Sequence, residues 1–261
     1  MVLTTYRKKG IRLTHVWFAS EDELQRLVKG RAGTDVFFVH GAKYIDCPTS
    51  IMVFEQPSLI KHIPENEAAV WETYGKHLKA YIKRSIREET EVRVFCARDI
   101  SSDLLDICAK LYEQMKAAKG MDDTFNRRLA ESYAKQDALV IAMAYVKQRP
   151  VGFSAYIADD AHFRAWLTAF AFREEEFDAQ VVSRAHQLLE WETMRYCCRS
   201  GITSYDFGGI VSFDNPNGID KFKLNFAKEG ERVTYDNFLL GSSLLGKAGI
   251  VAYKFYKKVK K

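Results

Sequence analysis

Apolar residues recur every three or four positions between residues 71 and 89. This spacing puts them on one side of an α-helix, because successive helical residues are rotated by about 100°. Basic residues form a single stripe on the other side, which is either a solvated face or an anion-binding one. The apolar set is Trp71, Tyr74, Leu78, Ile82 and Ile86, and the basic set is Lys76, Lys79, Lys83 and Arg87.

Three short runs before this helix are rich in β-branched and aromatic residues and are bounded by Gly, Asp or Pro, which predicts strands. They span 11–18, 35–40 and 50–54. We therefore expect residues 1–90 to form a small N-terminal α/β portion that ends in the basic helix.

After residue 90 the pattern alternates between strand and helix periods in the order β-α-α-β-β-β-α-β-α-β. Three consecutive strands with short turns predict an antiparallel meander, and the helical crossover that follows predicts a parallel pair. A sheet that changes direction in this way can splay open into a cleft. The expected class is α/β (α+β), with a mixed sheet and a splayed crossover over 91–241. The predicted ranges are 91–97, 102–119 (capped by Ser102), 124–135, 138–146, 151–157, 162–172, 178–199, 203–207, 218–226 and 232–240.

Composition is that of a folded protein of one or two domains, with 47% hydrophobic and 28% charged residues among 261. No run of 18 consecutive apolar residues occurs, and the first ten residues lack the apolar segment of a signal peptide. The five cysteines are irregularly spaced and include no C-x-x-C pair. We expect free thiols in the cytoplasm, no metal site and no bound cofactor.

Positive charge gathers at the two ends of the chain. Residues 247–261 contain six lysines and no acid, and residues 1–12 contain four basic residues. A basic C-terminal tail, 242–261, with interspersed leucine, isoleucine, valine and phenylalanine favours contact with an anionic surface, such as the inner face of a membrane. The alternative is a solvated tail that keeps the protein in solution.

Two segments near the C-terminal end resemble a known family. Tyr205-Asp-Phe-Gly-Gly-Ile210 and Asn215-Pro-Asn-Gly-Ile-Asp-Lys-Phe-Lys223, followed by Phe226, resemble the C-terminal block of the FemAB-like (peptidoglycan-bridge) aminoacyltransferases, which have the GNAT acyltransferase fold. Ala227 stands where that block ends in Gly. The resemblance covers about residues 70–240 and implies that residues 1–90 correspond to a truncated second GNAT unit.

Acyl transfer to an amine needs stabilisation of a tetrahedral oxyanion and a destination for the amine proton. Lys223 follows the crossover strand and can reach the cleft as a cation, and the resemblance points to the same Phe-Lys pair. An exposed surface lysine is the alternative. Asp206 ends a strand at the opening, where it can orient the amine or take its proton, or else cap the amides of the following glycines.

Further candidates for substrate binding surround these two residues. The glycines after Asp206 permit close approach of a ligand, and strand aromatics can line the cleft, although such residues more often belong to a core. The set is Phe222, Tyr205, Gly208, Gly209, Asn215, Tyr156, Trp166 and Arg84. His162 and His186 show no partner in the sequence and are interpreted as structural.

The loop 172–178, before the longest predicted helix, holds no Gly and four acids against one arginine. Such a loop is unsuited to a CoA pyrophosphate, which favours free amides at a helix N-terminus. The resemblance therefore leaves the donor as aminoacyl-tRNA or as acyl-CoA bound in another way. The acceptor would be an amine of a peptidoglycan or polysaccharide precursor, nucleotide- or lipid-linked. A non-catalytic protein that binds RNA or membrane is the alternative of another class, and DNA is not an expected partner.

Overall fold

The computed structural model describes residues 1–8, 10–30, 33–42, 50–172 and 177–259. The chain divides into two compact units, of which unit 1 comprises 1–58 with 232–261 and unit 2 comprises 59–231. These limits differ from the boundaries at 90 and 241 expected from the sequence. The difference arises because the last strand pairs with the N-terminal strands, a long-range contact that local periodicity does not encode.

Unit 1 is built on a mixed sheet. β1 (Val2–Lys8) pairs antiparallel with β2 (Ile11–Trp17), β2 pairs parallel with β3 (Val36–His40), and β3 pairs antiparallel with β10 (Glu231–Gly241). The parallel pair is joined through α1 (Glu21–Gly30), which begins with a capping box between Ser20 and Glu23. β1 was not expected from the sequence. α8 (Leu244–Val259) completes the unit, so most of the predicted tail is a helix.

A histidine pair lies within this sheet. The Nδ1 of His15 is 2.8 Å from the Nε2 of His40, and the ring of His40 stacks on Trp17 at 3.9 Å. Burial, assisted by the charge of Lys8, lowers the pKa of His15 to about 4. His15 is therefore held neutral at a pH where it would be protonated in the unfolded chain.

This histidine makes the stability of the fold pH-dependent. Between the unfolded pKa near 6.5 and the folded value near 4, only the unfolded chain gains the proton, so stability falls as the pH falls. We expect the free energy of unfolding to drop by about 2 kcal/mol more between pH 7.5 and pH 5 in the native protein than in His15→Gln. Urea titrations at both pH values measure this, and equal drops in the two proteins would contradict it.

Unit 2 contains the meander that the sequence predicts. β5 (Thr90–Cys96), β6 (Leu139–Val146), β7 (Arg149–Ala158) and β8 (His162–Phe170) are successively antiparallel. β9 (Ser204–Gly209) then pairs parallel with β8, as expected from the helical crossover. β4 (Ser50–His62), much longer than predicted, runs from unit 1 into unit 2 and is the other neighbour of β9.

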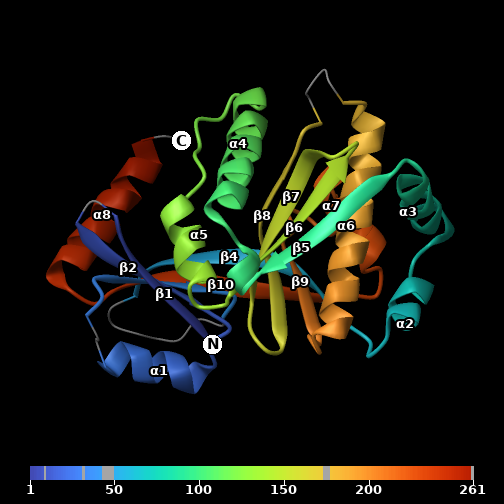
Figure 1. Ribbon diagram of the computed structural model, residues 1–261. Helices are drawn as coiled ribbons and strands as arrows, with labels where there is room; N and C mark the ends of the chain where they lie inside the picture. The colour runs from blue at the N-terminus through green and yellow to red at the C-terminus, as the bar shows by residue number, and fades with distance from the viewer. Residues whose placement is uncertain (9, 31–32, 43–49, 173–176, 260–261) are drawn as a thin grey trace. The chain divides into compact units, whose positions relative to one another are not determined.

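Helices cover both faces of the unit 2 sheet (Figure 1). α4 (Ser102–Ala118) and α5 (Arg127–Ala134) lie on one face, and α6 (Ala179–Arg199) and α3 (Lys76–Arg87) lie on the other. The crossover helix α6 has ten buried residues, seven of which are hydrophobic core residues. The short helices η1 (Ala97–Asp99), α2 (Glu67–Glu72) and α7 (Gly218–Phe226) complete the unit.

Two sequence predictions about these helices were wrong in detail. The helix expected over 71–89 is interrupted, because α2 ends at Glu72 and Gly75 in extended conformation is the N-cap of α3. Ser101, rather than Ser102, caps α4, since its backbone is extended and its side chain accepts from the amide of Leu104. With two serines in succession, only the backbone conformation decides which one is the cap.

Candidate functional site

The strands β8 and β9 separate after a short parallel pairing. Only three residue pairs join them, and the last is Arg164 with Asp206. Immediately beyond, the pairing of β8 with β7 shifts so that Ala155 faces Leu167 and Tyr156 faces Ala165, which leaves Trp166 as an extra residue on β8. Such a bulge bends a strand and redirects its side chains. The bulge therefore accounts for the splay that the sequence predicted.

A cavity of about 510 Å³ occupies this opening, and all of its lining residues belong to unit 2. Five elements besides the loop after β8 supply its walls: α4, β8, β9, α6 and α7. Most of the wall is apolar, with a few polar groups among aromatic rings. Its members include Met115, Lys119, Trp166, Phe170, Phe172, Ser183, His186, Glu190, Gly208, Gly209, Ile219, Phe222 and Lys223.

Lys223 lies in the cavity wall on α7. Its Nζ donates a 2.6 Å hydrogen bond to the carbonyl oxygen of Gly209, on the neighbouring strand end. Burial lowers the pKa of Lys223, while the charges of Glu190, Asp206 and Asp220 oppose that shift. The ammonium therefore sits at the end of β9, half-buried, where a developing negative charge would be weakly solvated.

The position of α7 is fixed by an acid that sequence reasoning missed. Asp220 is buried and its carboxylate accepts from the backbone amides of Val211, Ser212 and Asn217. Asn217 in turn accepts from the amide of Asp220, which forms a capping box at the start of the helix. The N-x-x-D spacing is the signal that could have identified it. Asn215, exposed in the same loop, donates its backbone amide to Ser212 Oγ and lies outside the cavity wall.

A buried carboxyl group lies on the α6 side of the cavity. Glu190 is 5% exposed and accepts hydrogen bonds from the hydroxyls of Tyr156 and Tyr205, both fully buried. Burial raises the pKa of both tyrosines well above the ordinary value, so they remain donors. Both belong to the core behind the cavity rather than to its wall, where the sequence had placed them as candidate substrate contacts.

His186 joins the same network one helical turn earlier. Its Nε2 is 3.7 Å from Glu190 Oε1, and its ring stacks on Phe222 at 4.0 Å. The expectation that the two histidines lack partners was wrong, because His162 also pairs with Asp159 at 2.9 Å. The spacing His-x-x-x-Glu on a helix, which places both side chains on one face, was the sequence signal for the first pair.

Asp206 does not line the cavity. Its Oδ2 is 3.1 Å from the Nη1 of Arg164, and both side chains are almost completely buried. Its Oδ1 accepts from the amide of Gly208 at 2.8 Å. Gly208 has φ +72°, and a Cβ there would lie 3.1 Å from the Ala165 carbonyl oxygen. Asp206 thus holds the turn at the mouth of the cavity, which is the capping alternative left open by the sequence.

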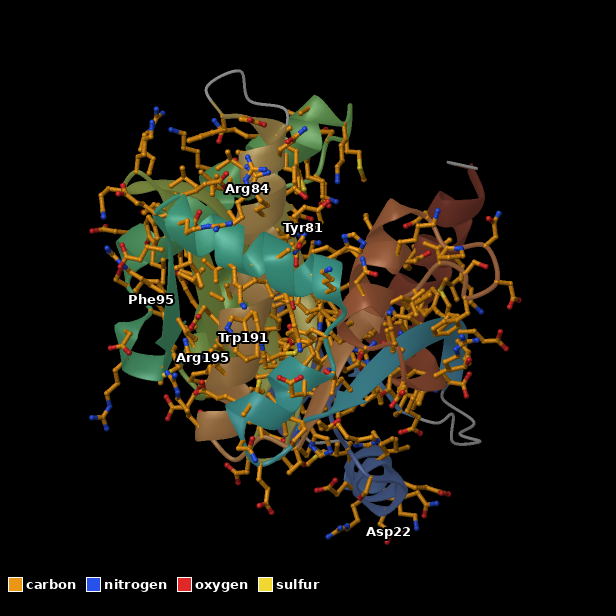
Figure 2. All side chains as sticks on the ribbon, turned by 90° about the vertical axis from the view of Figure 1, so that its right-hand side faces the viewer. Asp22, Tyr81, Arg84, Phe95, Trp191 and Arg195 are labelled. Atoms are coloured by element: carbon orange, nitrogen blue, oxygen red, sulfur yellow. The ribbon has the colours of Figure 1, made fainter. Side chains whose placement is uncertain are left out.

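Arg84 lies elsewhere in unit 2, on the outer face of α3 (Figure 2). Its Nε binds Glu88 Oε1 at 2.9 Å, and the same carboxylate accepts two hydrogen bonds of 2.7 Å from Arg184 of α6. This arrangement fastens the end of α3 to α6. Arg84 does not line the cavity.

The acidic loop before α6 is mostly outside the described residues, which omit 173–176. Asp178 is described, and its side chain caps α6 by accepting from the amide of Gln180 at 2.7 Å. An anion at this helix end would meet that carboxylate. Among the described residues no three or more His, Cys, Asp or Glu side chains gather as metal ligands. In the same part of the chain, no helix is long and apolar enough to cross a membrane.

The site combines what an acyl transfer requires: an apolar chamber, a cation at a strand end, and an imidazole paired with a carboxyl group. It unites five of the ten residues predicted from the sequence. Lys223, Phe222, Gly208, Gly209 and Trp166 line the cavity. Tyr205, Tyr156 and Asp206 lie behind its wall, and Asn215 and Arg84 lie apart from it.

Comparison with known proteins places the chain in a family. Residues 76–224 match the acetyltransferase (GNAT) domain family, and no curated protein matches the chain. FemX is 10% identical, with a TM-score of 0.58 over 90% of this chain and 83% of that one. The C-terminal domain of a protein described as a lysylphosphatidylglycerol synthetase from Agrobacterium fabrum is 12% identical, with a TM-score of 0.56 over 95% and 83%. L-PGS from Bacillus licheniformis is 12% identical, with a TM-score of 0.52 over 91% and 79%.

At such low sequence identity, the structural similarity to these proteins shows only that the fold is shared. The family match is stronger, because it covers more than half of the chain and runs from α3 into α7, so it includes most of the cavity wall. The chain belongs to the acetyltransferase (GNAT) family, and it is an acyltransferase.

Proposed function

We propose that this protein forms an amide by transferring an acyl or aminoacyl group to an amine of a cell-envelope precursor. The observation that supports this most is the cavity between β8 and β9, whose wall contains both Lys223 and the His186–Glu190 pair. The envelope assignment is supported by the FemAB-like segments and by neighbours named for the synthesis of an aminoacylated phospholipid. The acceptor is an amino sugar or peptide amine of peptidoglycan or polysaccharide.

Lys223 stabilises the oxyanion in this proposal. The acceptor amine attacks the donor carbonyl, whose oxygen becomes negative in the tetrahedral intermediate. A half-buried ammonium at the end of β9 interacts strongly with that charge because little water screens it. Gly209, whose carbonyl oxygen now accepts from Lys223, keeps the ammonium directed into the opening.

His186 accepts the proton that the amine loses. When the tetrahedral intermediate collapses, the bond from the acyl carbon to the donor's oxygen (aminoacyl-tRNA) or sulfur (acyl-CoA) breaks, and His186 returns the proton to that leaving atom. The Nε2 of His186 lies 3.7 Å from Glu190 Oε1, so the carboxyl group faces the ring that takes the proton in this proposal. The stacking on Phe222 fixes the ring plane. Asp206 acts in this proposal as a positioning residue that holds the turn at Gly208.

We expect His186→Gln to lower kcat by about 10²-fold, the lower end of the range for general acid–base catalysis. His162→Gln is the matched control, since His162 lies outside the cavity wall and pairs with Asp159. A kcat of His186→Gln within a few-fold of the native value, with folding intact, would refute the assignment.

A comparison of envelope precursors from cells with and without the protein identifies the acyl group and the acceptor. Mass spectrometry of envelope precursors from cells with and without the protein gives the mass of the group added. Incubation of the purified full chain with charged tRNA or with acyl-CoA then separates the two donors. We expect one donor to support amide formation; an unchanged precursor pool together with no turnover on either donor would favour the non-catalytic alternative.

A further inference from the structure

We propose that the outer face of α8 binds the surface of an anionic lipid membrane. The opposite face of this helix packs on the sheet of unit 1, where Ile250 is buried in a cluster with residues of β3 and β10. Gly246 lies so close to Asp35 that a Cβ would meet its carbonyl oxygen at 1.9 Å. This tight packing fixes the rotation of α8 about its axis, and therefore which side chains face outward.

The outward side is a continuous apolar surface. Leu244, Leu245 and Val251 are 88%, 55% and 44% exposed, and Ala248 and Ala252 are exposed beside them. At about 100° per residue these five residues occupy an arc of about 120°. We call them the apolar face of α8. An exposed apolar face of this kind on a helix marks an interaction surface.

Lysines border the apolar face. Lys247 and Lys254 lie within about 60° of Val251 around the helix, and residues 247–261 contain four further lysines and no acid. The side chains beyond Lys254 are outside the described residues. Apolar side chains flanked by lysines match the interface of a membrane with anionic headgroups, where both kinds of contact form at once. A purely apolar protein partner would leave this charge unused.

The helix α3 in unit 2 provides an internal comparison. It is also basic, and Tyr81 and Ile86 are 47% and 55% exposed. These two side chains lie about 140° apart on the helix, so they form no continuous apolar face. If positive charge alone were sufficient, α3 would bind anionic lipid as well as α8 does. If an apolar face bordered by lysines is required, only substitutions on α8 should weaken the binding.

The test is co-sedimentation of the full chain with phosphatidylcholine vesicles, with and without phosphatidylglycerol. We expect salt-sensitive binding to the anionic vesicles. Leu244→Ser/Val251→Ser should weaken it by about tenfold or more, because two apolar contacts are lost. Lys247→Glu/Lys254→Glu should weaken it by about tenfold in low salt. Tyr81→Ser/Ile86→Ser, the control on α3, should leave it unchanged.

Three results would overturn the proposal: no binding of the full chain in low salt, equal binding by Leu244→Ser/Val251→Ser, or equal weakening by the α3 control. Sedimentation velocity in the absence of lipid, which measures the oligomeric state, can give a fourth such result. A dimer that dissociates in Leu244→Ser/Val251→Ser would assign the apolar face to a second copy of the chain. Because none of these side chains is buried, thermal unfolding of each variant should match the native protein. No turnover is measured, so the result is independent of the proposed reaction.

Discussion

Replacing Lys223 with alanine should lower kcat by about 10²–10³-fold, the range for loss of one donor that stabilises an oxyanion. The ammonium lies in the cavity wall and is half-buried, so water cannot replace its interaction with a developing charge at the same strength. The loss should appear in kcat, because the charge to be stabilised forms only on the way to the tetrahedral intermediate. Steady-state kinetics with a saturating acceptor measure it.

Lys221→Ala is the matched control, because Lys221 is exposed on the same short helix and does not line the cavity. Burial lowers the pKa of Lys223, so the rate should fall as the pH rises and the ammonium is lost, at a pH below that of an ordinary lysine. Lys223→Arg should keep the charge and move that fall upward. A kcat of Lys223→Ala within a few-fold of the native value, with folding intact, would exclude the assigned role.

The parts of the fold that depend on short-range patterns were predictable from the sequence. The antiparallel meander and the crossover through 178–199 follow from turns and periodicity, and the parallel pairing of β8 with β9 follows from the crossover. The pairing of β10 with β3 was not predictable, because local sequence patterns do not specify which distant strand pairs with the edge of a sheet. The unit boundaries differ from the expected domain limits for the same reason.

In the site, sequence motifs located the backbone better than the side chains. The Phe-Lys and Gly-Gly segments do meet at the cavity. The alternation of strand residues does not reveal which face is the core and which is the cleft, and Tyr205 and Tyr156 point to the core. Trp166 reaches the cavity because a bulge, invisible in the pattern, interrupts that alternation. Glu190 was overlooked because two of its partners, Tyr156 and Tyr205, come from separate strands.

Replacing Asp206 with alanine should lower the free energy of unfolding by about 3–5 kcal/mol, because Arg164 then loses its carboxylate partner in a buried site. Urea denaturation measures the change, with the exposed Asp214→Ala as control. Asp206→Leu/Arg164→Leu removes both charges together and should recover about 2 kcal/mol or more of the loss.

A residue that takes the amine proton would behave differently from one that only positions Gly208. Its loss would leave the double variant inactive however stable it became, whereas a residue that only positions Gly208 should allow activity to return in part with the fold. If Asp206→Ala were as stable as the native protein but had a kcat about 10²-fold lower, Asp206 would have to be assigned a catalytic role.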